Sequence, residues 1–119
     1  MSSDLSLKKA FIETQDKHQV TVRQLANVKG QINAKERDRK IGELAAKELS
    51  QYPQGTVAYK SVGKMFLQQD LAKMTQALQQ RSEDAGKEVK SLARAQEKLE
   101  RDVKDLERGL TELLQRRMM

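Results

Sequence analysis

The sequence predicts a mainly α-helical chain, in which two long helices form an antiparallel coiled coil and are joined by one β-hairpin. A regular seven-residue leucine repeat runs through the second half of the chain, and a weaker repeat runs through the first half. Between them lies a short segment with the single proline, two glycines and several β-branched and aromatic residues. Of the 119 residues, 34% are charged and only 37% are hydrophobic, so a narrow helical seam is expected rather than a thick core. We expect residues 1–119 to form one domain.

The first helix is expected over residues 4–50. Asp4 is placed to cap its start, and Pro53 with Gly55 is placed to end it. Its apolar seam is weak, with seven-residue steps through Phe11, His18, Leu25 and Ile32. After these steps the seam is expected to slip into another register, formed by Ile41, Leu44 and Leu49.

The second helix is expected over residues 70–117, with Asp70 as its N-cap. An unbroken heptad supports it, formed by Leu71, Leu78, Ala85, Leu92, Leu99, Leu106 and Leu113. Such spacing keeps one stripe facing a partner helix, as in coiled coils.

Residues 56–69 are predicted to form the hairpin, with strands at 56–60 and 65–69 and a turn in which Gly63 takes a positive φ. Met65 and Leu67 fall on one face and Phe66 on the other, so both faces need cover. An isolated hairpin is marginal in water, and the rest of this chain offers no strand to join it. We therefore predict that the hairpin joins strands of other chains. The residues assigned to this oligomerisation are Val57, Tyr59, Val62, Gly63, Met65, Phe66 and Leu67.

A hairpin between two helices of similar length brings the two ends of the chain together. There an apolar cluster is predicted, formed by Leu5, Leu7, Phe11, Ile12, Leu110, Leu113, Leu114, Met118 and Met119. Flexible methionine side chains suit unselective apolar contacts. The cluster either closes the end of the helical seam or grips exposed apolar segments of another protein, and the pattern alone favours neither.

Several functions are disfavoured by composition. Without cysteine, and with His18 as the single histidine, the chain has no disulfide, thiol nucleophile or histidine metal cluster. No catalytic constellation or glycine-rich phosphate loop is present, so we expect no enzyme activity and no cofactor. No apolar run approaches the ~20 residues that span a bilayer, and the first residues lack a secretory signal. We expect a cytoplasmic location, and an additional nuclear one stays open.

The net charge of +6 raises the question of nucleic-acid binding. Acidic residues are interspersed with the basic ones, and the four aromatic residues are too few for base stacking, so nucleic acid is not an expected partner. A purely structural coiled-coil subunit of a tethering or scaffold complex stays open as an alternative.

Two segments resemble a known family. Residues 4–11 (DLSLKKAF) and residues 59–67 (YKSVGKMFL) are similar to the opening and the hairpin of β-class prefoldin subunits, most of all eukaryotic prefoldin subunit 1. The order of helix, single hairpin and helix in about this length also fits the β-class, whereas α-class subunits carry two hairpins.

This resemblance implies a subunit of a hexamer of α-class and β-class prefoldin subunits, whose hairpins build a barrel platform from which coiled coils extend. It implies that the coiled-coil tips hold unfolded actin and tubulin chains and deliver them to the cytosolic chaperonin without using ATP.

Overall fold

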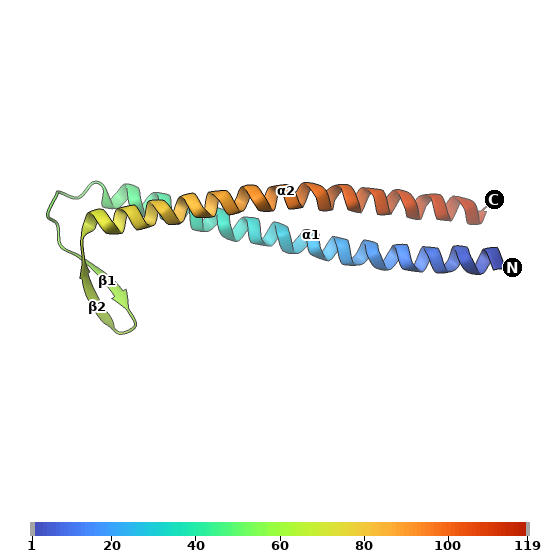
Figure 1. Ribbon diagram of the computed structural model, residues 1–119, viewed down its shortest axis with the longest axis horizontal. Helices are drawn as coiled ribbons and strands as arrows, with labels where there is room; N and C mark the ends of the chain where they lie inside the picture. Colours follow the sequence, from blue (N-terminus) through green and yellow to red (C-terminus); the bar gives the residue numbers. More distant parts are fainter. Residues whose placement is uncertain (1, 119) are drawn as a thin grey trace. The chain divides into compact units, whose positions relative to one another are not determined.

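The computed structural model describes residues 2–118 and the side chains of residues 3–117. Its elements are α1 (Ser2–Leu49), β1 (Ala58–Val62), β2 (Met65–Gln69) and α2 (Leu71–Met118), shown in Figure 1. Two long helices joined by one antiparallel hairpin confirm the predicted fold class.

The chain divides into two compact units, each built from parts of both helices. The hairpin unit is Ile32–Lys90 and contains β1 and β2. The terminal unit contains the described residues up to Gln31 and those from Ser91 onward.

Helix α1 begins two residues earlier than expected, so Asp4 lies in its first turn and does not precede it. A carboxylate at this position still favours the helix, because the first turn carries the positive end of the dipole. At the other end, the N–H of Tyr52 donates to the carbonyl of Leu49 at 3.3 Å, a tight turn that closes the helix before Pro53. Gly55 follows with φ +90°, which confirms the predicted break.

The expected register slip in α1 is wrong. Half-buried and buried positions continue after Ile32 with the same alternating steps of three and four, through Lys35, Arg39, Gly42, Ala46 and Leu49. Ile41 and Leu44 lie off this seam and are 56% and 66% exposed. The seam of the hairpin unit therefore uses small and charged residues where larger apolar ones lie nearby in the sequence.

The small residues of this seam allow a close approach of α1 and α2. A Cβ added to Gly42 would lie 3.0 Å from the carbonyl oxygen of Leu78 and 3.3 Å from the Cβ of Ser82. Beside this contact, the hydroxyl of Ser82 donates to the carbonyl of Arg39 at 3.1 Å. Gly42 is thus required by packing, whereas Gly30 has no atom within 4 Å of such a Cβ.

The charged residues of the same seam are paired. Lys35 Nζ lies 2.8 Å from Glu88 Oε2 on α2, and this hydrogen bond is the main cause of the raised pKa of Lys35. Arg39 contacts Glu36 at 3.1 Å and Glu43 at 2.9 Å on its own helix. These side chains are partly exposed, so the pairs set which residues face each other more than they stabilise the fold.

The structure confirms the heptad predicted for α2. Each leucine of the predicted repeat is half-buried, and Ala85 is buried. Asp70 acts as the predicted N-cap, because its Oδ1 accepts a hydrogen bond from the N–H of Ala72 at 3.2 Å.

The two strands of the hairpin pair antiparallel, with Val62 opposite Met65. The connection is therefore the two residues Gly63 and Lys64. Gly63 has φ +61° and Lys64 does not have a positive φ, the pattern of a type II′ turn. The first strand begins two residues later than expected, because the N–H and hydroxyl of Thr56 both donate to the carbonyl of Pro53. The turn so formed leaves Val57 outside both strands.

In the terminal unit the two helices meet along the predicted seam. His18 lies on this seam, and its Nε2 is 3.3 Å from Glu107 Oε1 on α2. A Cβ added to Gly109 would lie 3.9 Å from Thr14, an ordinary van der Waals distance. The single histidine thus has an interhelical partner.

Neither helix, over the part of the chain described, has a stretch long and apolar enough to cross a membrane. Among the same residues, no group of three or more histidine or acidic side chains is arranged to hold a metal ion.

Candidate functional site

The hairpin carries apolar side chains on both faces. Paired residues of neighbouring strands share a face, so the register places Val62, Met65 and Leu67 together on one face. Tyr59 and Phe66 share the opposite face as diagonal neighbours. The strand pairing therefore confirms that Met65 and Leu67 lie on one face and Phe66 on the other.

These side chains are uncovered. Phe66 is 72% exposed and Met65 is 66% exposed, and the other large apolar residues of the hairpin are exposed as well. Val57, between the Pro53–Thr56 turn and β1, is also exposed. Each strand has only one paired edge in this two-stranded sheet. Exposed apolar faces and open edges favour pairing with further strands.

The terminal unit contains a second candidate site, a groove of about 350 Å³ between the start of α1 and the end of α2. We call it the terminal groove. The residues that line it are Asp4, Leu5, Leu7, Lys8, Phe11, Leu113, Leu114 and Arg117. Five of the nine residues predicted for the apolar end cluster are therefore brought together.

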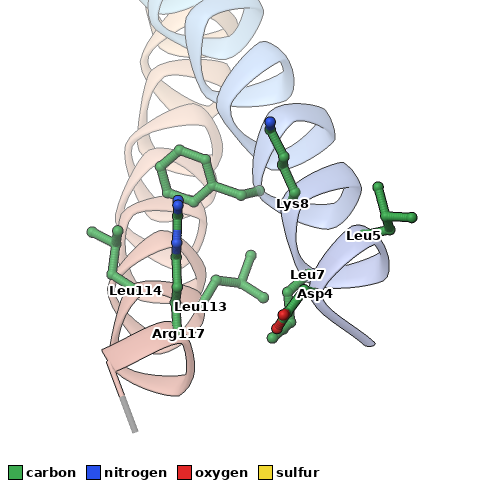
Figure 2. A pocket seen from close by; sticks show the side chains of 8 residues that line it. Asp4, Leu5, Leu7, Lys8, Leu113, Leu114 and Arg117 are labelled. Carbon is green, nitrogen blue, oxygen red and sulfur yellow. The ribbon is translucent and has the colours of Figure 1, made fainter. Parts of the chain in front are cut away.

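The apolar residues of the terminal groove have two roles. Leu7 and Leu113 point toward each other between the helices in Figure 2 and are half-buried. Leu5 and Leu114 point outward from α1 and α2, and Leu5 is 71% exposed. The first pair joins the helices, while the second pair leaves apolar surface open to another molecule.

The other predicted members of the cluster lie elsewhere. Ile12 is exposed on α1 and Leu110 is half-buried on α2, and neither lines the terminal groove. The side chain of Met118 and the whole of Met119 lie outside the described residues.

Sequence reasoning missed the charged residues of the groove, Asp4, Lys8 and Arg117. A helical wheel offers a signal for one of them, because Lys8 follows Asp4 at the i, i+4 spacing that places both on one side of α1. Arg117 follows Leu113 and Leu110 in the same row of α2. Charged residues at such positions are usually read as solvated, and only the groove shows that they border an apolar surface.

Known proteins with similar sequences belong to one family. The prefoldin subunit family model matches residues 13–117. The chain is 32% identical over 110 residues to the probable prefoldin subunit 1 of Dictyostelium discoideum, covering 92% of this chain and 96% of that protein. It is 33% identical over 113 residues to prefoldin subunit 1 of Arabidopsis thaliana, covering 95% and 88% of the two chains.

A solved structure shares the fold. The crystal structure of the prefoldin beta subunit from Thermococcus strain KS-1 superimposes with a TM-score of 0.77, over 86% of this chain and 90% of that one, at 20% sequence identity. With the family match over most of the chain, the helices, the single hairpin and its open faces have one explanation: the chain belongs to the prefoldin subunit family.

Proposed function

We propose that this chain captures unfolded polypeptides in the terminal groove while its hairpin holds it in a hexamer with α-class and β-class prefoldin subunits. In this proposal unfolded actin and tubulin are among the captured chains, and the assembly passes them to the cytosolic chaperonin without using ATP. The observation that carries the proposal is the terminal groove. It is an apolar surface that contains no residue of the hairpin.

Membership of the prefoldin subunit family makes the chain a subunit of a co-chaperone that assembles with other prefoldin subunits. The family is a family of non-enzymatic chaperone subunits. The hairpin supplies a physical reason for assembly. Strands of neighbouring subunits would cover its two apolar faces and pair with its two open edges at the same time.

The outward-pointing leucines support capture of unfolded chains. Burying a leucine side chain contributes about 1.5–3 kcal/mol, so Leu5 and Leu114 together give weak binding that is easily reversed. Several such grooves in one assembly would act on the same polypeptide, and the effective concentration of each would raise the overall affinity. Weak individual contacts would then permit release.

The proposal places this activity in the cytoplasm, with the nucleus as a second compartment. The chain carries no glycine-rich phosphate-binding sequence, in keeping with capture that needs no nucleotide. Removing ATP is therefore expected to leave capture unchanged, which an aggregation assay with and without a nucleotide-hydrolysing enzyme would check.

The test of capture uses a photo-crosslinking amino acid in place of Leu114, within the complex assembled from all its subunits. We expect denatured actin to crosslink to this position, because Leu114 opens outward from the groove. The matched control carries the same amino acid in place of Val22, an exposed apolar residue of α1 that does not line the groove.

Equal yields at the two positions would remove the groove from client capture. A structural subunit of a tethering or scaffold complex would give no crosslink at either. We also expect Leu5→Ser with Leu114→Ser to lower the affinity of the groove for denatured actin about 100-fold, the loss of about 3 kcal/mol, while the complex still assembles. The readout is a crosslinker in place of Asp4, which lines the groove.

A further inference from the structure

The terminal groove combines an apolar floor with charged side chains at its border. Lys8 and Arg117 carry positive charge there, against the single negative charge of Asp4. In Figure 2, Arg117 extends along α2 beside Leu113 and Leu114, and Lys8 rises from α1 on the other side. In this view both cations lie between the two outward-pointing leucines, Leu114 on α2 and Leu5 on α1. A peptide that contacts both leucines would therefore pass the two cations.

These two cations have no partner within the described chain. Neither Lys8 nor Arg117 has a carboxylate oxygen within 4.0 Å among the side chains of residues 3–117. Most lysines and arginines among the described residues are in the same state, so Lys8 and Arg117 are distinguished by their place at the border of an apolar groove.

Helix dipoles account for only part of this arrangement. Asp4 lies in the first turn of α1 and Arg117 in the last turn of α2, where each is favoured by the helix end that it faces. Lys8 lies beyond the first turn of α1, where no dipole favours a cation. Its charge is therefore available to a ligand of the terminal groove.

We infer that the terminal groove selects apolar segments of unfolded polypeptides that are flanked by aspartate or glutamate, the leucines holding the apolar side chains while Lys8 and Arg117 pair with the carboxylates. This inference rests on the proposed capture of unfolded chains and adds a preference to it. The guanidinium of Arg117 is suited to bidentate pairing with a carboxylate, and the adjoining apolar surface reduces screening by water.

The test measures crosslinking of three peptides to the assembled complex that carries the photo-crosslinking amino acid in place of Leu114. The peptides share one apolar core and differ only in flanking residues, which are aspartate, asparagine or lysine. We expect the aspartate peptide to bind about fivefold more tightly than the lysine peptide at low salt, the size expected of two partly exposed ion pairs. Added salt is expected to reduce this ratio.

Charge reversal then assigns the preference to the groove. Lys8→Glu with Arg117→Glu is expected to invert the order of the aspartate and lysine peptides and to leave the asparagine peptide unchanged. The matched control is Arg23→Glu with Arg101→Glu, which changes the net charge equally at two exposed residues of the terminal unit outside the groove. We expect it to keep the original order.

The outcomes separate the two proposals. Equal binding of all three peptides to the complex that keeps Lys8 and Arg117 would overturn the charge preference and leave capture standing. An equal effect of the control variant would do the same. Absence of crosslinking by every peptide would overturn capture itself, and the preference with it.

Discussion

Replacing Phe66 with aspartate is expected to exclude this chain from the prefoldin complex. Phe66 lies on the hairpin face that it shares with Tyr59 and is 72% exposed in the single chain. In the proposed platform of hairpins this face would be covered, and a carboxylate buried there without a partner costs several kcal/mol. Phe66→Asp should therefore weaken incorporation more than 100-fold, on the order of 3 kcal/mol, measured as the fraction of chain that co-purifies with tagged partner subunits.

The control is Phe66→Leu, which keeps an apolar side chain at the same position and is expected to assemble. Circular dichroism of each separate chain would show that both helices still form, because Phe66 contributes nothing to the seam between them. Stoichiometric recovery of Phe66→Asp with its partners would show that the hairpin does not build the assembly.

Replacing Gly42 with alanine is expected to destabilise the chain, although alanine is the better helix former. The new Cβ would lie 3.0 Å from the backbone oxygen of Leu78, which moves only if α2 moves. Overpacking of this kind costs about 1–3 kcal/mol, which offsets or exceeds the gain in helix propensity of about 1 kcal/mol. The free energy of unfolding should therefore fall by up to about 2 kcal/mol, measured by urea denaturation followed by circular dichroism.

Gly30→Ala is the matched control, because the same substitution meets no atom within 4 Å there. It should raise the free energy of unfolding by about 1 kcal/mol, through helix propensity alone. Two stabilising alanines would show that the helices do not pack closely at Gly42.

Helix α2 was predictable because leucine occupies six of the seven positions in one row of its seam. Leucines at steps of seven indicate both the helical period and the buried face, and the aspartate before them marks the start of the helix. The hairpin was predictable for a similar local reason, because Gly63 at a positive φ and flanking β-formers leave few alternatives.

The seam of α1 in the hairpin unit was not predictable from apolar residues. Ile41 and Leu44 attract attention by their size, yet Gly42 and Ala46 occupy the buried positions. A small residue is buried where two backbones approach closely, and that approach depends on the residues of the other helix, here Leu78 and Ser82. The hydrophobic pattern of α1 alone contains no information about these residues of α2.

Sequence by itself determined the number and type of elements and the hairpin turn, because each follows from local chemistry and periodicity. Tertiary structure decided which residues of α1 face α2, and which charged side chains border the terminal groove. Both depend on which residues of the two helices meet when the helices pack. Lys8 and Arg117, for example, are far apart in the chain and border the same groove only in the folded protein.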